Sequence, residues 1–320
     1  MTERFQPEVD LLVPVYRPDR KFSRLLQMIR RQTYPVGRII VVNTEKAYWN
    51  QAGYGDVPGL EVHHVTKEEF DHGATRNLAA KYSGADVMIF MTDDAVPQDE
   101  FLVERLVEAL GRRGPEGETA AMAYARQMPD KGCRMIERIT RKFNYPDQER
   151  VKTAKDLPVL GIKTYFASNV CCAYRKEIFD RLGGFIARAI FNEDMIYAAN
   201  VIREGYAIVY APEARVIHSH NMTLAGQFRR NFDLAVSQAD HPEVFGGLPS
   251  EGEGIRLVKA TARELVRAGR FGLLPALVVG SGCKYLGYRA GRLHRKLPRD
   301  VILKCTMNRE YWERQWREQP

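Results

Sequence analysis

Residues 86–97, DVMIFMTDDAVP, decide the fold of this 320-residue chain. Their first half is an unbroken apolar run, which is typical of a strand buried on both faces of a sheet. The run ends at two adjacent carboxylates, Asp93 and Asp94. One interpretation is a turn, because an aspartate carboxylate accepts hydrogen bonds from the nearby backbone. The other is a metal site at the carboxyl end of a buried strand.

Composition is that of a soluble globular protein, with 45% apolar and 28% charged residues. The first ten residues are polar, so the sequence predicts no secretory signal. The longest apolar stretch, residues 271–282, is shorter than the about 20 residues that a membrane-spanning helix needs. Five cysteines, two of them adjacent at Cys171 and Cys172, favour a reducing compartment over a disulfide framework. We therefore expect a cytoplasmic protein.

Strands and helices alternate along the first 125 residues. Apolar runs at 9–16, 38–43 and 85–91 predict buried strands, and residues 61–65 predict a short one. Between them, residues 19–32 carry apolar side chains at helical spacing. This alternation predicts an α/β fold with a mostly parallel sheet and helices on both faces.

The pattern changes after residue 125. Residues 127–165 are polar and predict irregular structure. Residues 169–174 then predict a strand and residues 192–205 a helix that ends at a glycine. The stretches 206–212 and 214–220 predict two short strands.

The net charge of +8 is concentrated in the last part of the chain. From residue 255 onward there are 15 Lys and Arg against 5 Asp and Glu, a net +10, which leaves −2 for the first 254 residues. We therefore expect one domain over 1–245 and a basic, amphipathic helical extension over 246–320. Such an extension suits a peripheral contact with an anionic membrane, and the alternatives are that it packs on the first domain or forms a homodimer contact. Nucleic-acid binding is disfavoured because no recognised module is present. A basic stripe at helical spacing is formed by Arg256, Lys259, Arg263 and Arg267.

Polar residues follow three predicted strands at their carboxyl ends, where parallel α/β sheets bind ligands. They are Arg17, the triplet 43–45 and the triplet 92–94. Two adjacent buried carboxylates repel each other unless a cation or donors offset them. Sites with few oxygen ligands suit Mg²⁺ or Mn²⁺ when a substrate phosphate completes the coordination. The combination favours a metal site at Asp93 and Asp94 over a plain turn.

A second set of candidates starts at the predicted helix of residues 73–83. Asp71 lies just before it and Arg76 lies in its first turn. A helix N-terminus attracts anions, and arginine favours phosphate and carboxylate partners. The alternative is that Asp71 caps the helix and Arg76 is solvated.

Two further pairs of residues have side chains suited to catalysis or metal binding. Glu193 and Asp194 begin a predicted helix, where acids complement the helix dipole or serve as a general base. His218 and His220 alternate along a predicted strand, so both imidazoles can face one ligand, although packed histidines are the alternative.

Six stretches together, in this order, resemble family-2 glycosyltransferases and their bacterial rhamnosyltransferase-like branch. The resemblance covers residues 9–245. It implies a GT-A fold and an inverting enzyme that uses a nucleotide-diphosphate sugar. The stretches are VPVYRP (13–18), VVNTE (41–45), FDHGATRN (70–77), FMTDDAVP (90–97), NEDMIYAANVIREGY (192–206) and VIHSHN (216–221).

This resemblance also implies roles for individual residues. The DxD motif of the family, which binds the metal–diphosphate, aligns with residues 92–94, so threonine replaces its first aspartate. Asp94 then becomes the main ligand of Mg²⁺ or Mn²⁺, and Asp93 contacts the donor. Asp194, beside Glu193, becomes the leading candidate for the base, and His218 or alternatively His220 a further metal ligand. The donor would be recognised by Pro14, Tyr16, Arg17, Asn43, Thr44, Glu45, Asp71 and Arg76.

The expected reaction is transfer of a sugar, rhamnose from dTDP-rhamnose, to a hydroxyl of a cell-surface polysaccharide or lipid-linked glycan. It would occur at the inner face of the cell membrane. Thr92 leaves open a second function, a weakly active or inactive protein that binds sugar nucleotides or a partner. Nucleotidyl transfer is disfavoured because residues 15–22 contain no glycine.

Overall fold

The computed structural model describes residues 5–248 and 251–318. Their contacts divide the chain into two compact units. The first comprises residues up to 128, 145–187 and 193–218, and the second comprises 129–144, 188–192 and 219 onward. The expected boundary at 245/246 stays a prediction. None of the helices in the described ranges is long and apolar enough to cross a membrane.

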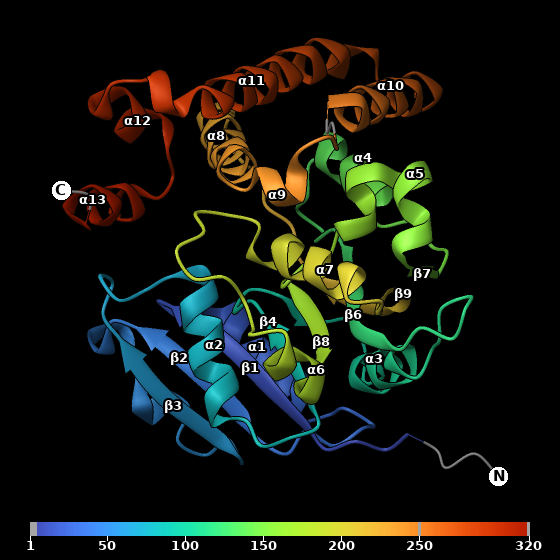
Figure 1. The fold of residues 1–320 in the computed structure, drawn as a ribbon, viewed down its shortest axis with the longest axis vertical. Coiled ribbons are helices and arrows are strands. Elements are labelled where there is room, and N and C mark those ends of the chain that lie inside the picture. The colour runs from blue at the N-terminus through green and yellow to red at the C-terminus, as the bar shows by residue number, and fades with distance from the viewer. Residues whose placement is uncertain (1–4, 249–250, 319–320) are drawn as a thin grey trace. The chain divides into compact units, whose positions relative to one another are not determined.

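Within the described residues, nine strands form one sheet in the first unit (Figure 1). Their order is β3-β2-β1-β4-β8-β6-β9-β5, and β7 pairs with β9. The strands are β1 (Val9–Tyr16), β2 (Ile39–Thr44), β3 (Leu60–Val65), β4 (Val87–Met91), β5 (Val96–Pro97), β6 (Ala120–Met128), β7 (Arg150–Lys152), β8 (Cys171–Arg175) and β9 (Ala207–Ile217).

Helices of the first unit connect the strands. They are α1 (Arg20–Ile29), α2 (His72–Tyr82), α3 (Leu102–Leu110), α5 (Leu157–Leu160), α6 (Lys176–Arg181) and α7 (Glu193–Arg203). The parallel pairing expected from the alternation is confirmed for β1 to β4. All five residues of β4 are buried, so its apolar run lies between two covered faces.

Strand β8 makes the sheet mixed, because it lies antiparallel between β4 and β6. The chain enters β8 at the end where β4 finishes, and Thr92 N donates to Val170 O at 3.2 Å. The residues just before β8 are therefore placed at the carboxyl ends of β1 and β4. This edge of the sheet carries the candidate site.

Two local expectations are wrong. Residues 127–165 contain α4 (Met135–Asn144), β7 and α5 rather than irregular structure alone. The stretches 206–212 and 214–220 form one strand, β9, which ends at Ile217 and contains a bulge opposite β6. The bulge lies where the two stretches were expected to separate, and the chain continues through Pro212 in the same strand.

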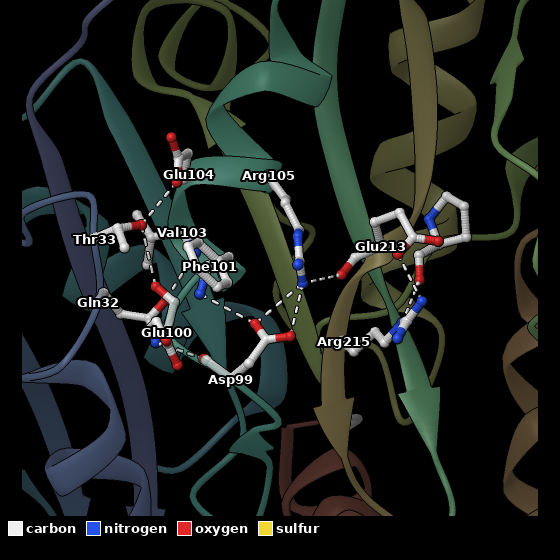
Figure 2. A network of polar contacts seen from close by, with 11 residues as sticks. Gln32, Thr33, Asp99, Glu100, Phe101, Val103, Glu104, Arg105, Glu213 and Arg215 are labelled. Atoms are coloured by element: carbon white, nitrogen blue, oxygen red, sulfur yellow. Dashed lines mark hydrogen bonds and ion pairs between the residues drawn. The ribbon is translucent and has the colours of Figure 1, made fainter.

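Polar contacts fix the end of α1, the start of α3 and β9 to one another (Figure 2). Arg105 Nη1 bonds both carboxylate oxygens of Asp99, at 2.8 and 3.1 Å, and the carbonyl oxygen of Glu213, at 2.7 Å. Gln32 Oε1 accepts from Val103 N at 3.0 Å, and Gln32 Nε2 donates to Asp99 O at 2.9 Å. The network fixes Asp99, five residues after Asp94, to the start of α3 and to β9.

The second unit is helical in its described part. Its helices are α4, α8 (Leu224–Asp240), α9 (Pro242–Phe245), α10 (Glu251–Arg267), α11 (Leu274–Arg292), α12 (Arg299–Cys305) and α13 (Arg309–Glu318). Figure 1 shows α11 lying against α8. A small apolar core includes Phe232, Ile302 and Trp312. The helical character expected after residue 255 is confirmed.

Candidate active site

The two aspartates after β4 lie in a turn at the carboxyl edge of the sheet. Ala95 N donates to Thr92 O at 3.1 Å, which closes the turn. Asp93 Oδ2 accepts a hydrogen bond from Tyr16 N at 3.2 Å and so joins the ends of β1 and β4. Burial, with a smaller contribution from the charge of Asp94, raises the pKa of Asp93 to about 6, although the hydrogen bond from Tyr16 N acts to lower it. Asp93 and Asp94 therefore lie in a turn that is itself part of the proposed ligand-binding edge, so the two interpretations of this segment are compatible.

Asp94 faces a histidine from the end of β9. Its Oδ1 lies 3.5 Å from His218 Nε2. His218 Nδ1 lies 3.1 Å from Gln127 Oε1, and an amide oxygen can only accept, so this nitrogen carries the proton. Gln127 is oriented because its Nε2 donates to Tyr145 Oη at 2.5 Å and Ser168 Oγ at 2.9 Å. In its neutral form, His218 therefore has its lone pair on Nε2, the nitrogen that lies nearest Asp94.

These two ligand atoms fit one divalent ion. At a separation of 3.5 Å, Asp94 Oδ1 and His218 Nε2 are close enough for both to bind a single ion. A carboxylate oxygen suits Mg²⁺ or Mn²⁺, and an imidazole nitrogen whose second nitrogen is fixed suits a transition metal, so this pair fits Mn²⁺ better than Mg²⁺. His220 follows two residues later with an exposed side chain. Both histidines lie just beyond Ile217, the last residue of β9, rather than within the strand. The ligand atoms of Asp94, His218 and His220 nevertheless lie within 4.8 Å of one another, so both imidazoles can face one ligand, as expected.

Arg17 and Glu45 follow β1 and β2 with unusual backbone geometry. Both have positive φ angles, 54° and 66°, which direct their side chains away from the path of the strands. Arg17 Nη2 donates to Tyr48 Oη at 2.7 Å, and its guanidinium lies over the rings of Tyr48 and Tyr16. Glu45 Oε1 accepts from Lys67 N at 2.6 Å. The result is an aromatic and cationic surface at the strand ends.

Buried polar atoms without protein partners lie at the same edge. Asn43 Oδ1, Thr44 Oγ1 and Thr92 Oγ1 have no hydrogen-bond partner among the described residues. Asn43 is held in place because its Nδ2 lies 3.1 Å from His64 Nδ1. Buried polar groups are nearly always bonded in folded proteins, so these atoms suit a polar ligand. Pro14 lies two residues before the end of β1 and is partly buried.

Asp71 and Arg76 have structural partners. Asp71 Oδ1 caps α2 by accepting from Gly73 N at 3.0 Å and Ala74 N at 2.8 Å, which was the alternative interpretation of this residue. Arg76 is buried rather than solvated, and its Nη1 lies 3.2 Å from Glu193 Oε1. The pair joins the first turns of α2 and α7.

Glu193 and Asp194 differ in their surroundings although they are adjacent. Burial acts to raise the pKa of Glu193, but Arg76 and His72 outweigh it, so the pKa lies below the ordinary value. The charge of Arg76 also acts to lower the pKa of Asp194, but more weakly than the effects that raise it. Burial and the neighbouring charge of Glu193 raise its pKa to about 7. Of the two, Asp194 has the pKa that suits a general base near neutral pH.

Asn169 connects these carboxylates to the edge of the sheet. It lies in the two-residue turn, 169–170, that comes just before β8. Its N donates to Asp194 Oδ2 at 3.2 Å, and its Nδ2 donates to Glu193 Oε1 at 3.2 Å. Its Oδ1 accepts from Tyr174 Oη at 2.7 Å. Sequence reasoning missed Asn169 and Gln127. A signal existed for Gln127, a polar residue inside the apolar strand β6, but nothing local distinguished Asn169.

A cavity of about 780 Å³ in the first unit lies elsewhere. It is lined by the amino ends of β1 and β2, including Val9, Asp10 and Arg38. Parallel α/β sheets bind ligands at the opposite, carboxyl edge. The arrangement of polar groups, and not the size of the cavity, therefore identifies the site.

Known proteins similar to the chain are consistent with this geometry. The family model described as "Glycosyl transferase family 2" matches residues 10–183. The O-antigen chain rhamnosyltransferase RfbN of Salmonella typhimurium is 34% identical over 309 residues, which cover 95% of this chain and 96% of that protein. The O-antigen chain rhamnosyltransferase WbaN of Salmonella anatum is 31% identical over 311 residues, 96% of each chain.

A solved structure supports the fold. The mannosyltransferase PcManGT from Pyrobaculum calidifontis, in complex with GDP-Man and Mn²⁺, matches 98% of this chain and 89% of its own length, with a TM-score of 0.55 and 17% identity. The GT-A fold expected from the sequence is confirmed. The chain therefore belongs to glycosyl transferase family 2, as a rhamnosyltransferase-like member.

Proposed function

We propose that this glycosyltransferase moves rhamnose from dTDP-rhamnose to a hydroxyl group of a cell-surface polysaccharide or lipid-linked glycan, with inversion at the anomeric carbon. The observation that carries the proposal is the similarity, over 95% or more of the chain, to two proteins named as O-antigen chain rhamnosyltransferases. The acceptor would then be a growing glycan, and the enzyme would work peripherally at the inner face of the cell membrane.

Asp194 is the proposed general base. It takes the proton from the acceptor hydroxyl while that oxygen attacks the anomeric carbon and the bond to the diphosphate breaks. Its pKa of about 7 makes it both ionised and basic near neutral pH. Hydrogen bonds from Asn169 N and Met195 N, at 3.2 and 2.8 Å, fix its orientation. Glu193, held by Arg76, keeps a charge next to Asp194 and so maintains its basicity.

Asp94 and His218 are the proposed ligands of a Mg²⁺ or Mn²⁺ ion, with His220 as a further ligand. When bound, such an ion supplies positive charge that offsets the charge developing on the departing diphosphate. PcManGT, solved with Mn²⁺, supports the choice of metal. Gln127 holds the protonated nitrogen of His218 and so keeps the other nitrogen available as a ligand.

The strand ends of β1 and β2 are the proposed nucleoside site. Tyr16 and Arg17 offer an aromatic face and a cation, while Asn43 and Thr44 offer buried polar atoms for hydrogen bonds. Pro14 and Glu45 complete the pocket. Asp93 would contact the donor, and Asp71 and Arg76 would support base or phosphate recognition through the α2 N-terminus that they stabilise.

A donor panel tests this function. The purified chain, with Mn²⁺ or Mg²⁺ and a lipid-linked glycan acceptor, should release dTDP from dTDP-rhamnose faster than UDP or GDP from UDP-GlcNAc or GDP-mannose. Product analysis should give a β-linked sugar from an α-linked donor or the reverse, because inversion follows from one displacement. Binding of dTDP-rhamnose without any transfer would instead support the alternative, an inactive sugar-nucleotide-binding protein.

A further inference from the structure

Helix α11 has apolar residues on two opposite faces, which is unusual for a helix at a protein surface. Its inner face packs on α8 at close range. A Cβ atom on Gly287 would lie 2.2 Å from Phe228 O, and one on Gly291 would lie 2.2 Å from Phe232 O. Only glycine allows this contact, so the inner face is fixed by the packing against α8.

The outer face is exposed. Its exposed apolar side chains recur every seven residues, at 278 and 285 and at 279, 286 and 293, and seven residues are close to two helical turns, so they lie on one side of the helix. Val278 is 67% exposed, Leu286 60% and Tyr285 53%. Val279 and Leu293 continue the stripe at 52% and 46%. We call these five residues the outer stripe of α11.

An exposed apolar stripe of this length normally has a partner. The described part of the second unit supplies no cover, since all five side chains remain exposed within it. The inner face already satisfies the packing of the helix on α8. The outer stripe is therefore not needed for the fold of this unit.

Cations lie at both ends of the outer stripe. Arg267 and Arg270 are exposed just before α11, and Arg289 and Arg292 are exposed in its last turns. On α10, Lys259 and Arg263 are exposed as well, as part of the basic stripe noted in the sequence. The segment from residue 255 onward has a net charge of +10. The partner that matches this surface is apolar in its interior and anionic at its boundary.

We propose that the outer stripe of α11 docks on the surface of an anionic phospholipid bilayer. The valine, leucine and tyrosine side chains enter the boundary between headgroups and acyl chains, and the flanking arginines bind lipid phosphates. The helix lies on the membrane, in keeping with the finding that no described helix is suited to span one. A second copy of the chain is a poorer partner, because it would bring two strongly cationic surfaces together.

This inference rests on the proposed function in one respect: membrane docking brings the enzyme to a lipid-linked acceptor. The inference names the residues of α11 that contact the membrane. The basic stripe of α10 alone would predict an electrostatic contact with lipid headgroups and no insertion of apolar side chains. Docking through α11 should therefore depend on both apolar side chains and anionic lipid.

The test is vesicle co-sedimentation with the full chain and its variants. Vesicles contain phosphatidylcholine alone or with one third phosphatidylglycerol. The wild type should sediment with the anionic vesicles, and Val279→Glu and Leu286→Glu should each lower the partition coefficient at least about tenfold. Val159→Glu, at an 80% exposed valine in the first unit, is the matched control and should bind as the wild type does. Circular dichroism of each variant verifies that the helices are intact.

Three results would overturn the inference: no binding of the wild type to anionic vesicles, equal binding by the α11 variants, or equal binding to neutral vesicles. Light scattering that shows a dimer dissociated by Leu286→Glu, without vesicle binding, would assign the stripe to a second copy. Transfer to a water-soluble glycan is measured on the same proteins. If the wild type binds anionic vesicles but transfers no sugar, the proposed function is refuted and the docking surface stands.

Discussion

The raised pKa of Asp194 gives the sharpest test of the proposed chemistry. An ordinary aspartate is fully ionised at pH 6, so a base of that kind would give no change in rate between pH 6 and pH 8. Burial and the charge of Glu193 raise the pKa of Asp194 to about 7. The active, ionised form is then about 10% of the enzyme at pH 6 and about 90% at pH 8.

We therefore expect kcat/KM to fall about tenfold from pH 8 to pH 6 at saturating metal. Asp194→Asn should lower kcat at least about 100-fold, because the amide cannot accept the proton, and its residual activity should lose the acid limb near pH 7. Asp180→Asn, which removes an exposed carboxylate of α6 paired with Lys176, is the matched control and should leave the profile unchanged.

The assay is continuous detection of released dTDP, with dTDP-rhamnose and acceptor varied at each pH. Metal titrations at pH 6 and pH 8 exclude a change in metal occupancy as the cause of the limb. Near wild-type turnover by Asp194→Asn would refute the assignment of the base. A profile that is flat between pH 6 and pH 8 in the wild type would refute the environment described for Asp194.

Three further predictions concern other contacts. Arg76→Leu leaves Glu193 buried without its cation and should lower the free energy of unfolding by about 3–5 kcal/mol, measured by urea denaturation; an unchanged midpoint would contradict the ion pair. Gln127→Leu should weaken Mn²⁺ binding by the free protein about 10- to 100-fold in calorimetry, whereas Gln127→Glu, which keeps the acceptor for His218, should restore it; equal affinities would remove the positioning role. Gly287→Ala should lower the melting temperature, with a cost of about 1–3 kcal/mol, because the new methyl group meets a carbonyl of α8; a neutral effect would show that the helices can separate there.

Local patterns in the sequence were enough to predict the part of the fold that carries the donor edge. The apolar run of β4 predicted a buried strand, and the carboxylates after it were therefore expected where that strand ends. The same reasoning placed Arg17 and Asn43 at the ends of β1 and β2. These predictions succeeded because strand burial and the position of strand ends depend on residues close together in the chain.

The sequence alone determined the family, the alternation of strands and helices up to β4, and the set of candidate residues. Tertiary structure decided how those residues are paired. Arg76 binds Glu193, Gln127 orients His218, and Asn169 contacts Glu193 and Asp194 only because β8 runs antiparallel beside β4. The physical reason is that hydrogen bonds and ion pairs between distant segments leave no periodic pattern in the chain. The burial that raises the pKa of Asp194 and the charge of Arg76 that lowers the pKa of Glu193 likewise exist only once the segments have packed together.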